Sequence, residues 1–90
     1  METVKAHQLL GYAKAATEAC PKLAINPEGV LAIMKGLNAA DQADVAGSGV
    51  MTEHYKSESA KIFAMLGDGA CVAALGYEKK LGIDIFMEAK

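Results

Sequence analysis

The run Thr3–Cys20, TVKAHQLLGYAKAATEAC, carries small and apolar side chains at steps of three and four residues. This spacing places them on one face of an α-helix. The residues of that face are Ala6, Leu9, Leu10, Ala13, Ala16 and Cys20. Pro21 follows directly. The helix is expected to end there, because proline cannot donate a backbone hydrogen bond.

The segment Asn26-Pro27-Glu28 is the clearest helix start in the chain. Asparagine is a favoured N-cap, proline fits the first helical position, and an acidic side chain is stabilised by the positive end of the helix dipole. The second helix is expected to turn four apolar side chains inward, namely Val30, Leu31, Met34 and Leu37. Because Gly36 weakens this helix, it stays open whether residues 38–46 continue it or form a short separate one.

Gly47-Ser48-Gly49 is expected to form a turn, and two more helices are predicted after it. The first runs from about Val50 to Leu66, and its inward stripe is Met51, Tyr55, Ile62 and Leu66. Gly67 is expected to end it, and Asp68 to cap the helix that follows. That last helix, about Gly69 to Lys80, is apolar around most of its circumference, which indicates burial on more than one side.

The C-terminal tail is ambiguous. Ile83 and Ile85 alternate with Asp84 as in a strand, yet Asp84 could equally cap a last helical turn containing Phe86 and Met87. A single strand would lack a partner in the expected fold, so we favour a short helix or an apolar arm that docks on the bundle or on a neighbouring subunit.

Ninety residues allow one domain with one thin core. Seventeen of them are alanines, which favour helices and bury little area. We therefore predict an all-α fold over residues 1–90, a small antiparallel bundle of about four helices with a short C-terminal helix or apolar arm. A self-associating surface would add the burial that such a monomer lacks.

Charge and composition argue against several partners. The net charge is −2 and all nine basic residues are lysines, so specific nucleic-acid binding is not expected. No apolar stretch approaches the roughly 20 residues of a membrane span and no signal peptide is recognised, so we expect a cytoplasmic protein without membrane contact. Cys20 and Cys71 are then expected to be free thiols. Both are nevertheless predicted at the same end of the bundle, close enough for a reversible disulfide.

The residues that could carry chemistry do not converge. His7 and His54 are expected at the end of the bundle opposite the cysteines, so the four cannot surround one metal ion. His54 and Glu58 share a helix face, at a spacing that also suits an ordinary surface pair. No metal, cofactor or catalytic residue is expected.

Two functions follow from these observations. The first is non-enzymatic protein–protein interaction by self-association, as an adaptor, inhibitor or structural subunit. Its expected interface residues are Leu75, Tyr77, Ile83, Ile85, Phe86 and Met87. The alternative is a small-ligand-binding module that holds an anionic metabolite or nucleotide at helix ends or a subunit interface. Its expected ligand-binding residues are Tyr12, Gly47, Ser48, Gly49, Thr52, His54 and Tyr55.

Overall fold

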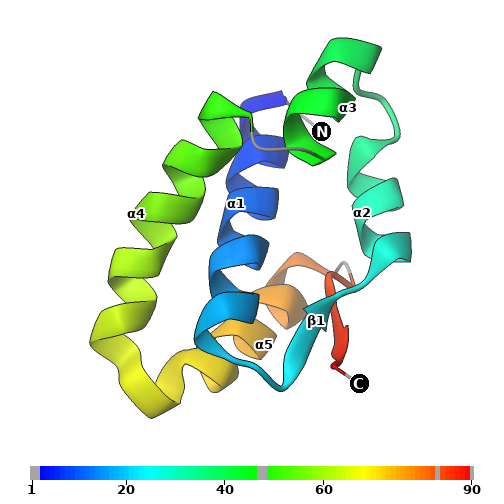
Figure 1. Cartoon of the computed structure of the whole chain (residues 1–90). Helices are drawn as coiled ribbons and strands as arrows, with labels where there is room; N and C mark the ends of the chain where they lie inside the picture. The colour runs from blue at the N-terminus through cyan, green and yellow to red at the C-terminus, as the bar shows by residue number, and fades with distance from the viewer. Residues whose placement is uncertain (1–2, 47–48, 83, 90) are drawn as a thin grey trace.

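The computed structural model in Figure 1 places four helices and a two-stranded sheet around one central helix. It describes residues 3–46, 49–82 and 84–89. The helices are α1 (Thr3–Ala19), α2 (Pro27–Met34), α3 (Ala39–Ala46), α4 (Val50–Leu66) and α5 (Ala70–Leu81). A 3₁₀ turn, η1 (Gly67–Gly69), joins α4 to α5, and β1 (Leu23–Ile25) pairs with β2 (Phe86–Glu88). The chain is mostly helical, as predicted, but the short α2 and α3 and the sheet make it something other than a plain four-helix bundle.

The central helix is α1, which is buried around most of its circumference. Its buried side chains are Ala6, His7, Leu9, Leu10, Ala13, Ala15 and Ala16. Helix α4 lies beside α1 and runs in the same direction (Figure 1). Gly11 allows this close approach, since a Cβ there would stand 2.7 Å from the backbone nitrogen of Lys56 and 2.8 Å from the carbonyl oxygen of Thr52.

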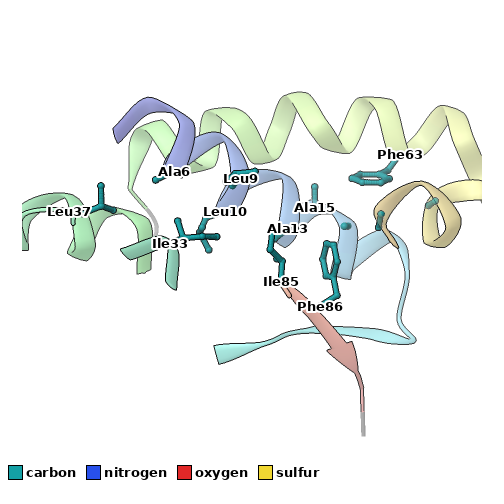
Figure 2. Packing of buried hydrophobic residues seen from close by; sticks show 13 residues of the cluster. Ala6, Leu9, Leu10, Ala13, Ala15, Ile33, Leu37, Phe63, Ile85 and Phe86 are labelled. Carbon is teal, nitrogen blue, oxygen red and sulfur yellow. The ribbon is translucent and has the colours of Figure 1, made fainter. Parts of the chain in front are cut away.

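The rest of the core reaches α1 from several elements (Figure 2). Ile33 approaches from α2, Phe63 from α4, and Ile85 and Phe86 from the end of the chain. Helix α5 runs back along α1, because Cys71 near its start is bonded to Cys20, while Tyr77 further on contacts Tyr12 nearer the α1 start. Helices α1 and α4 thus run in one direction and α5 in the opposite one, as expected for the first, third and fourth helices of an antiparallel bundle.

The tail does not form the short helix that was one of the two expectations, and residues 86–88 are a strand that does find a partner. The other expectation, an apolar arm that docks on the rest of the chain, is confirmed. Ile25 pairs with Phe86, and Leu23 pairs with Glu88, in an antiparallel register. The partner strand has only three residues, too few for a period-two pattern to be recognised in the sequence. Because this ribbon packs on α1, Ile85 and Phe86 are buried in the chain's own core.

The helix boundaries agree well with the sequence. The Asn26 side chain caps α2 by accepting a hydrogen bond from the Glu28 backbone N–H at 3.1 Å, as predicted. Its amide also donates to the carbonyl oxygen of Asp84 at 3.1 Å, which ties the start of α2 to the tail. Residues 39–46 form a separate helix, which settles the open junction.

The predicted inward faces are partly wrong. In α2, Leu31 is 66% exposed, while Ile33 is buried and Val30 and Met34 are half-buried. In α4, three members of the expected stripe are exposed, namely Met51, Ile62 and Leu66. The buried residues of α4 are instead Thr52 and Phe63.

The turn between α4 and α5 also differs in detail from the prediction. Gly67 has a φ of 55° and ends α4, as expected for glycine. Asp68, however, lies inside the 3₁₀ turn, and no side-chain hydrogen bond caps α5.

The α4–α5 region is long and apolar enough to meet a composition criterion for a membrane span, which was not expected from the sequence. Residues 50–81 contain an 18-residue window of mean hydropathy 1.3, apolar and long enough by composition to cross a membrane. Core helices of soluble proteins and signal sequences pass the same test, and in this fold Gly67 turns the chain within the stretch. The absence of membrane contact stays a prediction.

Candidate interaction surface

Five large apolar side chains are exposed on the two sides of the α4–α5 turn, and we call them the elbow surface. They are Ile62, Met65, Leu66, Val72 and Leu75. The most exposed are Met65, at 86%, and Val72, at 75%. Each of the five is at least 43% exposed.

The elbow surface arises from the local sequence. Six of the seven residues in Ala60–Leu66 are apolar, more than one helix face can bury. Phe63 occupies the buried face and packs against Tyr12, with ring centroids 5.0 Å apart. Its neighbours Ile62 and Met65 must then point elsewhere, because residues one and two apart do not share a helix face.

The chain as a whole also exposes more surface than its size requires. Its accessible surface is 5530 Å² for a mass of 9.4 kDa. A folded monomer of that mass is expected to expose about 5000 Å², roughly a tenth less.

The 3₁₀ turn and helix α5 contribute one exposed stripe to this region. Asp68 of the turn comes first, and Val72, Leu75, Gly76 and Lys79 of α5 follow; 72 and 76, and 75 and 79, are four residues apart, and all five residues are exposed. The opposite side of α5 packs inward through Ala70 and Ala74. The stripe is thus acidic at one end, apolar in the middle and basic at the other end.

A disulfide between Cys20 and Cys71 joins the end of α1 to the first turn of α5. The prediction that these cysteines are free thiols is wrong, although their placement at one end of the molecule is confirmed. Their Cα atoms are 5.3 Å apart. The pairing depends on the tertiary fold, since 51 residues separate the two in sequence.

Beside the disulfide lies an apolar hollow of ≈ 350 Å³ between α5 and the β-ribbon. Leu75, Phe86 and Met87 line it, with Lys22 and Glu88 at the ribbon. Because Leu75 belongs both to this hollow and to the elbow surface, the two adjoin.

The residues predicted for an interface fall into different places. Leu75 and Met87 are exposed, at 46% and 41%. Tyr77 is half-buried and packs against Tyr12, with the two rings tilted by 42° and their centroids 4.2 Å apart. Ile85 and Phe86 are core residues and cannot reach a partner without unfolding the tail. Ile83 lies outside the described residues.

The residues predicted to bind a ligand are also dispersed. Thr52 is fully buried, and its hydroxyl is 2.9 Å from Nδ1 of His7, with which it forms a hydrogen bond. Tyr12 is enclosed by Phe63 and Tyr77, and its hydroxyl donates to the carbonyl oxygen of Ala73 at 3.4 Å. Burial raises the pKa of both Tyr12 and Tyr77 above the usual phenol value.

The start of α4 holds the remaining predicted ligand residues. His54 is exposed and Tyr55 half-buried, with their rings edge to face at 5.3 Å. They border an open hollow of ≈ 550 Å³ with Val50 and Met51. Gly49 precedes α4 without a side-chain cap, and Gly47 and Ser48 lie outside the described residues.

One ion pair among the described residues joins two helices. Lys56 of α4 and Glu18 of α1 form an ion pair at 2.8 Å. The hydrogen bond to Glu18 is the main reason that the pKa of Lys56 is raised. Among the described residues, no three His, Cys, Asp or Glu side chains are grouped in a way that could hold a metal ion.

Comparisons with protein-family models, with curated proteins and with solved structures give no match to this chain. Sequence reasoning overlooked Ile62, Met65, Leu66 and Val72 as surface residues. The apolar run 60–66 was the available signal, since it holds more apolar residues than one face can bury.

Proposed function

We propose that this chain is a non-enzymatic interaction protein that self-associates through the elbow surface. The observation that carries the proposal is the exposure of five large apolar side chains, led by Met65 and Val72, on either side of one turn. Clusters of exposed large apolar side chains often mark interaction sites on soluble proteins. The thin, alanine-rich core gives the chain a further reason to gain burial from a partner.

The ligand-binding alternative has weaker support. Its two best hydrogen-bonding and stacking groups, the Thr52 hydroxyl and the Tyr12 ring, already contact other parts of the chain. The open hollow beside His54 and Tyr55 offers one imidazole and one phenol, and no lysine lines it among the residues that the structure describes. We therefore favour a protein partner over an anionic metabolite or nucleotide as the ligand of this chain.

The test is the solution mass by light scattering over a range of protein concentrations. We expect the wild-type protein to form an oligomer, and Met65→Lys to shift it toward the monomer, because a lysine ammonium would have to be desolvated in the interface. Leu31→Lys is the matched control, since Leu31 is a similarly exposed apolar residue on α2 and lies away from the elbow surface. Phe86→Ser is unsuitable, because Phe86 is buried and its loss would unfold the tail.

A wild-type protein that stays monomeric at every concentration would refute self-association. Equal effects of Met65→Lys and Leu31→Lys would show that the elbow surface is not the contact. Circular dichroism of each variant checks that its helices are intact.

The disulfide also bears on the compartment. Structural disulfides persist in oxidising environments and are rare in the reducing cytosol. We infer that the folded chain works in an oxidising environment, in preference to the cytoplasm expected from the sequence. Alkylation of thiols in protein taken directly from cells tests this inference, and fully alkylated Cys20 and Cys71 would refute it.

A further inference from the structure

We infer that the partner is a second copy of this chain, and that two copies pair through α5, antiparallel, about a two-fold axis. This inference rests on the proposed function, because it specifies which contact the self-association uses. The occupant of the elbow surface is thus a copy of the α5 stripe, and the assembly is a closed dimer.

The stripe is complementary to itself when it is reversed. If the two-fold axis passes midway between residues 73 and 74, Val72 lies against the partner's Leu75, and Leu75 against the partner's Val72. The same register places Asp68 against the partner's Lys79. A single alignment therefore matches the apolar pair in the middle and the opposite charges at both ends.

The structure leaves both charges available for this pairing. Asp68 and Lys79 are exposed, and neither belongs to the ion pairs formed among the described residues. Asp68 lies in the 3₁₀ turn directly before α5 and Lys79 in the last turn of α5, so the two charges stand at opposite ends of the stripe. Reversal of one copy then brings each charge opposite its counter-charge.

Gly76 allows the two helices to approach closely. It lies in the middle of the stripe, and a Cβ placed there would meet nothing within 4 Å in this chain. Small residues at a helix crossing let backbones come near each other, as Gly11 does between α1 and α4. Within α5, the helix itself gains nothing from glycine, which lowers helix propensity.

The α5 part of the elbow surface supplies two large apolar side chains to the pairing, Val72 at 75% and Leu75 at 46% exposure. Val72 is the most exposed apolar side chain of the stripe, and the pairing would cover it.

The experiment measures the dimer dissociation constant by sedimentation at low salt for charge-reversed variants. Asp68→Lys alone places two lysines against each other at both ends of the pair, and Lys79→Asp alone places two aspartates there. Each single variant should weaken the dimer about tenfold, since two contacts change from attraction to repulsion. The double variant should regain wild-type affinity.

Mixing the two single variants gives the sharpest outcome. A heterodimer of Asp68→Lys with Lys79→Asp has opposite charges at both ends. At one end the new lysine at position 68 meets the new aspartate at position 79, and at the other end the native Asp68 meets the native Lys79. The mixture should therefore dimerise with wild-type affinity, although each component alone does so weakly. Lys80→Asp, next to the stripe and equally basic, is the matched control and should change the affinity little.

Val72→Lys should weaken the dimer by more than about a hundredfold, because it places an unpaired charge in the apolar centre. Dissociation by Met65→Lys without any effect of Val72→Lys or the charge reversals would overturn this inference and leave the proposed function standing. A monomeric wild-type protein would overturn both. Higher-order oligomers that ignore the charge reversals would likewise contradict the closed two-fold pairing.

Discussion

Reduction of the Cys20–Cys71 disulfide should destabilise the fold by about 4 kcal/mol. The bond closes a loop of 51 residues, and the loss of chain entropy in the unfolded state that such a loop imposes corresponds to about 4 kcal/mol at 25 °C. A domain of this length has a total stability of roughly 5–13 kcal/mol, so reduction removes a large share of it. The expected drop in Tm is about 20 °C.

The effect should be large because little else holds the start of α5. That segment packs inward through Ala70 and Ala74, which bury little apolar area. Besides the disulfide, the Tyr12 hydroxyl donates to the Ala73 carbonyl oxygen at 3.4 Å. The Tyr12–Tyr77 contact and the bond from the Phe86 backbone N–H to Glu78 Oε2 at 2.6 Å hold the second half of α5.

Urea unfolding followed by circular dichroism at 222 nm measures the free energy of unfolding with and without a dithiol reductant. Protein concentration is held fixed, because self-association stabilises the folded state by mass action. The Cys20→Ser/Cys71→Ser variant should match the reduced wild-type protein and should not respond to the reductant. A loss below about 1 kcal/mol on reduction would refute the reasoning, since the entropic estimate is several times larger.

Three further outcomes are expected. Gly11→Ala should lower the free energy of unfolding by about 1–3 kcal/mol, because its Cβ would force α1 and α4 apart. Thr52→Val should cost about 1–3 kcal/mol, because it removes a buried hydroxyl that is hydrogen-bonded to His7. The free energy of unfolding should also fall as pH rises above about 10, since burial raises the pKa of Tyr12 and Tyr77, so that the unfolded chain loses these phenol protons first.

Each of these outcomes has its own measurement and control. For the glycine, Gly69→Ala should change the urea midpoint little, because the nearest atom to its Cβ is 4.0 Å away. For the hydroxyl, Thr17→Val is the comparison, since the Thr17 hydroxyl donates to the Lys14 carbonyl within its own helix and is only half-buried. Urea midpoints between pH 8 and 11 test the phenols, and substituting both tyrosines by phenylalanine should make the decline shallower.

The local features of the fold follow from the sequence alone. The Asn26 N-cap with Pro27 fixes the start of α2, and Gly67 fixes the end of α4, because these residues act through backbone geometry and hydrogen bonds to near neighbours. Helices α1, α4 and α5 begin and end within one or two residues of the predicted positions. The sequence also shows that residues 60–66 hold more apolar side chains than one helix face can bury, although it does not show which of them are exposed.

Tertiary structure alone decided the features that join distant parts of the chain. The β1–β2 pairing buries Phe86, and the Cys20–Cys71 bond ties α5 to α1, and both depend on contacts between residues more than fifty positions apart. The buried face of α4 was decided in the same way, since Gly11 brings the α1 backbone against Thr52 and leaves Ile62 and Met65 outside. Periodicity identifies a helix, but only its neighbours in space select which of its apolar faces is covered.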